Sequence, residues 1–330
     1  MTIPPLRSPC SIAFIVVVLL AALVPALSPA TASADAIPPP PLFPKPPVLE
    51  PNVEFWKRVY AEFGMGDFVL HDRENLLIIY EVVRVSEATN ERRAADLAKS
   101  EIQRLREQYE DILTALAQGK SPEELGPEGQ RVAELWGCPC EPDLLRRAAG
   151  NVRVQQGLRE KWDEGVQRAR GLMPRIVSIL RQHNVPVELA ALPMVESTFN
   201  PRARSKAGAV GLWQFIRSTA RSYLTVSRKR DDRHDPLRST QAAARLLKHN
   251  YEALGSWPLA IVAYNHGKAG VQTARERVGS DAIEDIIVRY NGPRFGFASK
   301  NFYPEFLAAL ELLHPTIRQH TGQENSRKGS

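Results

Sequence analysis

Apolar residues recur at helical spacing along much of the chain. One long amphipathic helix is predicted from about residue 87 to 119, with an apolar face made by Leu97, Ile102, Leu105, Tyr109, Ile112 and Leu116. A second periodic stretch covers 151–183, and its apolar positions are Leu158, Trp162, Val166, Met173, Ile176, Ile179 and Leu180. It leads directly into a third stretch at 186–199. Because few runs resemble strands, the sequence predicts a mainly α protein.

The other regions are less regular. Leu76 to Tyr80 is a short apolar run that could be a strand or the buried part of a helix, since periodicity cannot separate the two in so few residues. Proline is dense over 35–52, as in a stiff polyproline-like tether or a disordered segment. We therefore expect a Pro-rich linker over 35–52, a helical N-terminal region over 53–169, a second domain over 170–315, and a frayed polar tail over 316–330.

The helix predicted to start near Pro186 contains a carboxylate among apolar neighbours. Proline suits the first turn of a helix, because its missing N–H is not needed there. Pro193 should kink this helix, and Asn200 before Pro201 should end it. Glu196 is therefore expected in or near the last turn.

Two effects at that position should raise the pKa of Glu196. Burial disfavours the charged form, and so does the partial negative charge at a helix C-terminus. A carboxylic acid that keeps its proton near neutral pH is what acid-catalysed cleavage of a glycosidic bond requires. The alternative is an ordinary acid at a helix end, solvated or paired with Arg202 or Arg204.

A segment rich in small residues follows this helix and lets the backbone approach a ligand closely. Many letters of one family pattern recur here, at Leu189, Leu192-Pro193, Val195-Glu196-Ser197, Phe199-Asn200-Pro201, Ala203, Ser205, Gly208-Ala209 and Gly211-Leu212-Trp213-Gln214-Phe215. The stretch resembles the catalytic domain of lytic transglycosylases, the soluble-lytic-transglycosylase module, and especially the membrane-bound lytic transglycosylase D type. This resemblance implies a lysozyme-like (goose-type) catalytic domain over 170–315.

Two further segments resemble the same family. In 231–240, which is similar to DxRxDPxxST, Asp235 or Ser239 is expected to cap the next helix, and Asp–Arg pairs should hold the loop. In 259–267, which is similar to ALAAYNxG, Tyr264 would contact sugar, and Asn265 would orient an acetamido group or the acid. Alternatively, Asn265 and the glycine after it only end a helix.

The family's fourth motif, ETRxYVPK, is altered in this chain. Its tyrosine aligns with Phe302 if Pro304 is matched to the proline of the motif. A shift of one residue would give the same role to Tyr303. Both residues are therefore candidates for substrate binding.

The resemblance implies non-hydrolytic cleavage of the β-1,4 bond between N-acetylmuramic acid (MurNAc) and N-acetylglucosamine (GlcNAc) in peptidoglycan. Glu196 would protonate the leaving oxygen and then accept the proton of the muramoyl 6-hydroxyl, which closes on the anomeric carbon and leaves a 1,6-anhydro end. Ser205 and Gln214 would position the sugar, and Trp213 and Tyr264 would wall the groove. Peptidoglycan glycan strands are the expected partner, and we expect no cofactor and no metal.

Two other functions fit these residues. A lysozyme-type muramidase normally needs a second carboxylate within about 5–10 Å. Glu188 would lie about 12 Å from Glu196 along a helix, and the acids of 231–235 cannot be placed from the sequence. The second alternative is an inactive wall-binding scaffold.

Residues 1–34 resemble a secretory signal peptide. Arg7 precedes the apolar run from Ile12 to Val24, and Ala-Ser-Ala stands at 32–34. An uncleaved anchor is the alternative, although this run is short for a membrane span. We therefore expect an exported protein of the periplasm or cell envelope, without a stable membrane span after signal removal. The formal net charge of +6 suits an acidic polymer, but without an interleaved aromatic and basic patch we expect no nucleic acid partner.

Cys138 and Cys140 are the cysteines that follow the signal segment. A bridge across a single intervening residue is cramped, and no second cysteine pair completes a zinc site. We therefore expect a structural or unpaired role for them and not redox chemistry.

Overall fold

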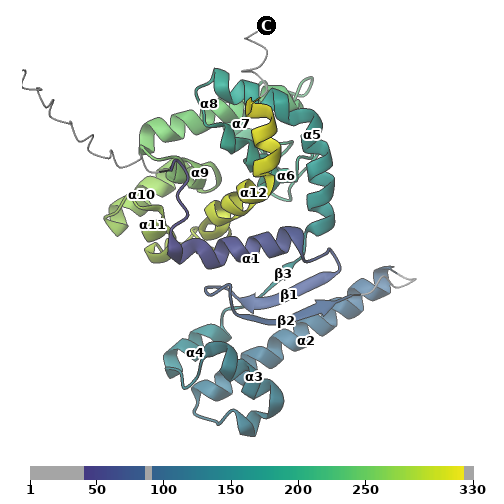
Figure 1. The fold of residues 1–330 in the computed structure, drawn as a ribbon, viewed down its shortest axis with the longest axis vertical. Coiled ribbons are helices and arrows are strands. Elements are labelled where there is room, and N and C mark those ends of the chain that lie inside the picture. Colours follow the sequence, from purple (N-terminus) through teal and green to yellow (C-terminus); the bar gives the residue numbers. More distant parts are fainter. Residues whose placement is uncertain (1–40, 86–90, 323–330) are drawn as a thin grey trace, which may run out of the picture. The chain divides into compact units, whose positions relative to one another are not determined.

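The computed structural model describes residues 41–85 and 91–322, so the predicted signal peptide lies outside the described residues. Helices dominate them, which confirms the mainly α prediction (Figure 1). The elements before residue 158 are the 3-10 helix Pro47–Leu49, α1 (Glu50–Ala61), β1 (Asp67–Asp72), β2 (Ile79–Arg84), α2 (Glu91–Ala117), the 3-10 helix Glu123–Leu125, α3 (Gly126–Trp136), α4 (Pro142–Ala149) and β3 (Val152–Gln156).

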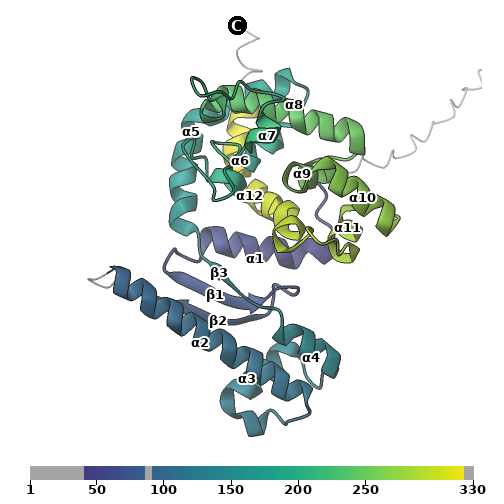
Figure 2. The same ribbon diagram turned by 180° about the vertical axis from the view of Figure 1, so that it is seen from behind.

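The second half of the chain is helical throughout. Its elements are α5 (Arg159–Gln182), the 3-10 helix Val187–Ala191, α6 (Leu192–Ser197), α7 (Arg217–Ala220), the 3-10 helix Asp232–His234, α8 (Pro236–Leu254), α9 (Trp257–His266), α10 (Lys268–Val278), α11 (Ile283–Arg289) and α12 (Phe297–Gly322). Seen from behind, α12 passes through the middle of the ring formed by these helices (Figure 2). Within the described residues, we find no helix with the length and apolarity of a membrane span.

A three-stranded antiparallel sheet lies between α1 and α2 (Figure 1). β1 is its central strand, and Leu70 is paired with Glu81 of β2 and with Val154 of β3. Successive residues of a strand face opposite sides, so Val69 belongs to the core that includes α1, whereas Leu70 belongs to the core that includes α2. The sequence could not assign the apolar run from Leu76 to Tyr80 to a strand or a helix. Its last two residues belong to the strand β2.

The smaller core contains one face of the sheet and α2, α3 and α4. Its largest buried side chains include Tyr80 and Tyr109, whose rings stack at 5.2 Å. The long helix predicted over 87–119 is confirmed as α2. A disulfide joins Cys138 and Cys140 beside this core, so the expectation that the cramped spacing would disfavour a bridge is wrong. Their Cα atoms lie 4.4 Å apart, which is at the short end of the range for bridged cysteines.

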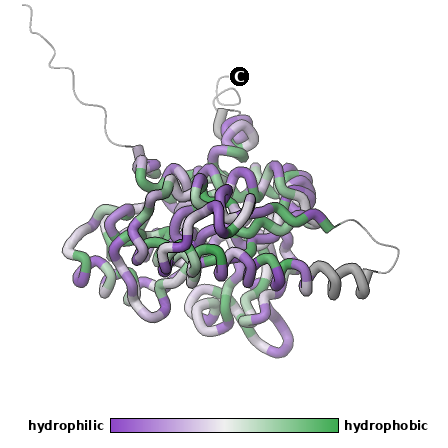
Figure 3. The backbone as a smooth tube through the Cα atoms, turned by 90° about the horizontal axis from the view of Figure 1, so that it is seen from below, coloured by the Kyte–Doolittle hydropathy of each residue, from purple (hydrophilic) through white to green (hydrophobic). Residues whose placement is uncertain are grey.

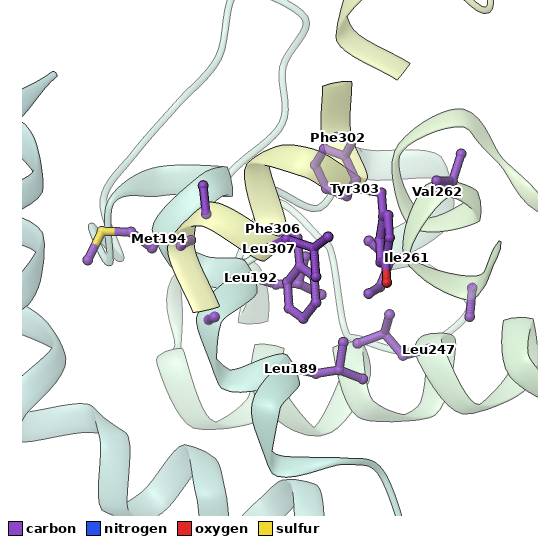
Figure 4. Close-up of a cluster of buried hydrophobic side chains, with 14 of the residues drawn as sticks. Leu189, Leu192, Met194, Leu247, Ile261, Val262, Phe302, Tyr303, Phe306 and Leu307 are labelled. Carbon is purple, nitrogen blue, oxygen red and sulfur yellow. The ribbon is translucent and has the colours of Figure 1, made fainter. Parts of the chain in front are cut away.

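The larger core is built around α12. Figure 4 shows side chains from five elements meeting there, namely Leu189, Leu192, Met194, Leu247, Ile261, Val262, Phe302, Tyr303, Phe306 and Leu307. Coloured by hydropathy, the backbone changes between hydrophobic and hydrophilic residues along its helices, as amphipathic packing requires (Figure 3). This core holds the short helix α6 in place.

Part of the expected linker is folded. Phe43 packs edge-on against Phe306 of α12, with ring centroids 5.2 Å apart. Lys45 forms ion pairs with Glu50 and with Glu311 of α12. The prediction of a tether over 35–52 is therefore wrong for the end of that range, because its apolar and charged side chains find partners on α12.

The expected fraying from Ile317 onward is also wrong for the first residues of the tail. α12 continues to Gly322, and Ile317 is only 2% exposed, against the larger core. This single apolar side chain keeps the last turns of α12 on the domain. The remaining tail lies outside the described residues.

Candidate active site

Glu196 lies near the end of α6, as the sequence predicts. Pro193 stands in the first turn of this helix, so it begins a new helix after a 3-10 turn and does not kink a continuous one. Thr198 and Phe199 have positive φ angles of 49° and 55°, so α6 ends before Asn200 is reached. The buried face of α6 faces the core, whereas Glu196 remains partly exposed.

The neighbouring serine ties this helix to the segment of small residues. The Ser197 hydroxyl donates to the carbonyl oxygen of Leu212 at 2.7 Å. Leu212 is fully buried, and so is Trp213 after it. The end of α6 is therefore attached to an immobile part of the core, which holds Glu196 in a defined position.

Burial raises the pKa of Glu196 from its ordinary 4.5 to about 8. Its carboxyl forms no hydrogen bond or ion pair with another residue of the described ranges, so Arg202 and Arg204 do not neutralise it. The alternative of an arginine-paired acid is therefore excluded in this structure. At neutral pH the group is a protonated acid.

Two tyrosines lie close to this acid. Burial raises the pKa of Tyr264 and of Tyr60, and the charge of Glu196 raises both further. The Tyr264 hydroxyl donates to the carbonyl oxygen of Trp213 at 2.7 Å, and its ring meets Phe215 edge-on. The ring of Tyr264 is therefore held beside Glu196.

Sequence reasoning missed a second acid, Glu305 in α12. Burial raises its pKa to about 8, and repulsion from Glu196 contributes to this shift. A hydrogen bond with Tyr60 and the charge of Arg153 act in the opposite direction. A signal was present in the altered fourth motif, where Pro304-Glu305 stands in place of Pro-Lys and reverses the charge.

Tyr60 and Arg153 reach this pair from the N-terminal part of the chain. Tyr60 ends α1 and stacks on Trp162 of α5 with ring centroids 4.9 Å apart. Arg153 of β3 lies over the ring of Phe297, 4.0 Å from its centroid. No sequence pattern pointed to these residues, because they depend on contacts between distant segments. The site thus combines α6, α9 and α12 with α1 and the sheet.

Three of the predicted substrate-binding residues lie in the core. Trp213 is fully buried, and its indole N–H donates to the Thr240 hydroxyl at 2.9 Å. Tyr303 is also fully buried and donates to the Pro44 carbonyl oxygen, and Phe302 is 4% exposed. A side chain without exposed area offers a sugar nothing to contact. In this structure these three residues belong to the larger core.

Besides Tyr264, three predicted residues keep some exposure, and their contacts are local. The Ser205 hydroxyl accepts from the Ala209 N–H at 3.0 Å, and the Gln214 amide donates to Gly211 at 2.8 Å. Asn265 is exposed near the end of α9, where its oxygen accepts from the Ser299 hydroxyl. Their roles in binding a sugar remain predictions.

The loop before α8 braces the segment of small residues. Arg233 pairs with Asp231 and donates to the carbonyl oxygens of Phe215 and Gly208 at 3.1 and 3.3 Å. Asp235 caps α8 through the N–H groups that follow it, which confirms one of the two capping predictions.

Taken together, α6 and the elements around it present a partly exposed carboxyl group with a raised pKa in a helical domain. Residues 176–287 match the family model described as the transglycosylase SLT domain. The chain therefore carries an SLT domain over these residues.

The relatives agree with this assignment. The chain is 42% identical over 153 residues to the membrane-bound lytic murein transglycosylase D of two Escherichia coli strains, a match that covers 46% of this chain and 33% of each relative. It is 31% identical over 121 residues to the membrane-bound lytic murein transglycosylase F of Aeromonas salmonicida, which covers 33% of this chain and 23% of that protein. The chain thus spans about a third or less of the length of these curated relatives.

A solved structure of the lytic transglycosylase Slt of Pseudomonas aeruginosa is also similar. It is 17% identical, with a TM-score of 0.35, and the match covers 71% of this chain and 36% of that chain. This similarity is too low to support an argument about the site.

Proposed function

We propose that this protein is a peptidoglycan lytic transglycosylase that cleaves the MurNAc–GlcNAc β-1,4 bond and leaves 1,6-anhydro-MurNAc ends. The observation that supports it best is the pKa of Glu196, raised to about 8 by burial, with no ion-pair partner among the residues that the structure describes. Such a group can give a proton at neutral pH, which an ordinary glutamate cannot. The lytic murein transglycosylases among its relatives support the substrate class.

The reaction needs one acid that acts twice. Glu196 gives its proton to the glycosidic oxygen as the bond to the anomeric carbon breaks. The resulting carboxylate then accepts the proton of the muramoyl 6-hydroxyl, whose oxygen bonds to the anomeric carbon. Atoms and charge balance without water, and the acid is regenerated. Tyr264 beside the acid would contact the sugar at this point.

Glu305 bears on the alternative of a lysozyme-type hydrolase. In that class the second carboxyl group must be ionised, either to attack the sugar or to activate water. Burial and repulsion from Glu196 raise the pKa of Glu305 to about 8, so it is mostly protonated at neutral pH. A neutral carboxyl is a poor nucleophile and a poor base, which favours the lyase.

Product analysis tests the proposal. Purified sacculi are digested and the soluble fragments are analysed by mass spectrometry. We expect muropeptides lighter by one water molecule than those with a reducing end. Reducing ends would instead identify a muramidase. A protein that bound sacculi but released nothing would be a scaffold.

Two variants test the acid. Replacement of Glu196→Gln keeps the shape of the side chain but removes the proton, so the rate should fall by about 10²–10⁴. Glu188→Gln is the matched control, because it makes the same change at a partly exposed acid of the preceding 3-10 helix. Equal activity of the Glu196→Gln variant and the parent would exclude Glu196 as the acid.

We further propose that the protein is exported and acts in the periplasm or cell envelope. The signal-like pattern of 1–34 supports this location. Fractionation of cells that express the full chain, followed by N-terminal sequencing of the mature protein, tests both export and cleavage.

A further inference from the structure

A polar cavity lies where α1, the loop after β1 and the start of α12 meet. Its volume is about 660 Å³, and the polar residues that line it include Asn52, Arg73, Asn151, Asn291, Lys300 and Asn301, together with one acid, Glu74. A second cavity of about 350 Å³ also has Arg73 and Asn151 in its wall, together with Arg106 and Arg153. The shared residues join the two cavities into one surface, which we call the cationic surface.

Three cations of this surface form no ion pair with a carboxylate of residues 41–85 or 91–322, namely Arg73, Arg153 and Lys300. Lys300 donates to the amide oxygen of Asn291 at 2.9 Å. Arg153 contacts the ring of Phe297. Neutral partners of this kind orient the cations but leave their charge available to a ligand.

The same cations repel one another. Burial lowers the pKa of Arg153, and the charge of Arg73 lowers it further. Burial also lowers the pKa of Lys300. The charge of exposed Glu74 raises this pKa, and the charge of Arg73 lowers it by a smaller amount. A bound anion would relieve this repulsion, so the cationic surface is arranged to take a negatively charged ligand.

Arg153 also connects the cationic surface to the acid pair. It is close enough to Glu305 to lower the pKa of that carboxyl. Glu305 in turn is close enough to Glu196 for repulsion to raise its pKa. A ligand group held on Arg153 therefore lies within electrostatic reach of the acids, as a group of the molecule cut there would.

We propose that the cationic surface binds an acidic peptide, the carboxylate-bearing stem attached to the glycan strand at Glu196. The identity of the ligand rests on the proposed function, whereas the presence of an anion site does not. Arginine matches a carboxylate with two parallel hydrogen bonds, and lysine adds a point charge. The side-chain amides in the cavity wall can bond to a peptide backbone. Neutral sugars alone would not require such a set of cations.

Calorimetric titration of the whole protein with a free stem tetrapeptide tests the site directly. The double variant Arg73→Gln with Lys300→Gln should weaken binding by at least about 10-fold, because charge-assisted hydrogen bonds are lost. Lys120→Gln with Arg147→Gln is the matched control, since both side chains are exposed and lie outside the two cavities. Equal affinity of both double variants would overturn the proposal. If the first double variant does not fold, the exposed Arg73→Gln change alone serves as the test.

Two further ligands check the chemistry. A tetrapeptide with amidated carboxyl groups should bind the parent about 10-fold more weakly or worse, and unchanged binding would contradict a carboxylate site. Inorganic phosphate should not displace the tetrapeptide at equal concentration. Displacement would identify a general anion site and overturn the assignment to a peptide.

Cleavage assays separate this inference from the proposed function. We expect the variant Arg73→Gln with Lys300→Gln to cut stem-bearing sacculi about 10-fold more slowly than the parent, and to cut amidase-stripped glycan at the parental rate. Equal slowing on both substrates would overturn the peptide site. If the parent cuts neither substrate, the proposed function fails, and the calorimetric result still decides whether the peptide binds.

Discussion

Glu196 in α6 and Glu305 in α12 form a coupled pair of carboxyl groups. Burial raises the pKa of each to about 8, and the charge of Glu196 contributes to the shift of Glu305. Neither carboxyl forms an ion pair with a residue of the described ranges. Both therefore keep their protons at neutral pH, and the site holds two acids where the proposed reaction uses one.

The coupling predicts that a change at one acid alters the other. In the Glu196→Gln variant the repulsion is removed, so the pKa of Glu305 should fall below about 8. It should stay above its ordinary 4.5, because burial is the larger cause of the shift. Titration of the labelled carboxyl carbon by NMR measures this. Glu188→Gln should leave the value unchanged, and an unchanged value in the Glu196→Gln variant would disprove the coupling.

The pH dependence of cleavage should have a single limb on the alkaline side. Glu196 must start protonated, so kcat/KM should be high below its pKa of about 8 and fall tenfold per pH unit above it. The carboxylate of the second step forms during the reaction, so no loss from an unionised base is expected down to about pH 5. Initial rates on solubilised glycan measure the profile. A bell-shaped curve with a limb between pH 5 and 7 would indicate a second, ionised carboxylate and favour a hydrolase.

Much of α6 was predictable from its sequence, because local rules control it. Proline placement and apolar spacing put Glu196 at a helix end, and burial among apolar neighbours at that end implied a raised pKa. These properties depend on neighbours within a few residues or on a motif with many fixed letters. The role of Tyr264 in contacting sugar stays a prediction.

The remainder of the site depends on contacts that local patterns do not encode. Tyr60 and Arg153 come from α1 and β3, far from Glu305 in the chain. Trp213 looked like a groove wall because aromatic rings stack on sugars, but the same apolar area also favours burial. Burial prevailed because Thr240 supplied a partner for its indole N–H.

Asp232 should stabilise the loop before α8 at neutral pH. It is only 8% exposed and accepts from Arg230 at 2.7 Å and from Arg238 at 2.8 Å. We expect Asp232→Asn to cost about 2 kcal/mol at pH 7, since hydrogen bonds to charged groups are lost. Asp281→Asn is the control, because that acid is 73% exposed and its ion pair should contribute less than about 1 kcal/mol.

The loss of stability at acid pH gives a second measurement of what Asp232 contributes. Hydrogen bonds from the arginines lower its pKa from 3.8 to about 2. Its contribution is therefore complete above about pH 4 and is lost as the pH falls through 2, because the unfolded state binds the proton first. Urea unfolding measures the free energy of unfolding of the parent and of Asp232→Asn. The difference between the two proteins should be smaller at pH 2 than at pH 7. A difference that is equal at both pH values would contradict this account.

Gly211 should not tolerate a side chain. Its φ is +83°, and a Cβ atom there would lie 1.9 Å from the carbonyl oxygen of Arg233. Backbone has to move to relieve this overlap, so Gly211→Ala should cost roughly 3 kcal/mol or more. Gly208→Ala is a matched control, because its φ is +80° but no atom lies within 4 Å of the added carbon. The control should cost only about 1–2 kcal/mol, the price of the left-handed conformation.

The same change should also lower activity, because Gly211 stands next to Leu212, whose carbonyl oxygen accepts the Ser197 hydroxyl at the end of α6. A shift of this segment moves the anchor of the helix that carries Glu196, and small displacements of a catalytic group can cost about 10²-fold in rate. Cleavage of sacculi by the two alanine variants, at a temperature where both are folded, compares them. If Gly211→Ala lost stability but cut at the rate of Gly208→Ala, the segment would support the fold without positioning the acid.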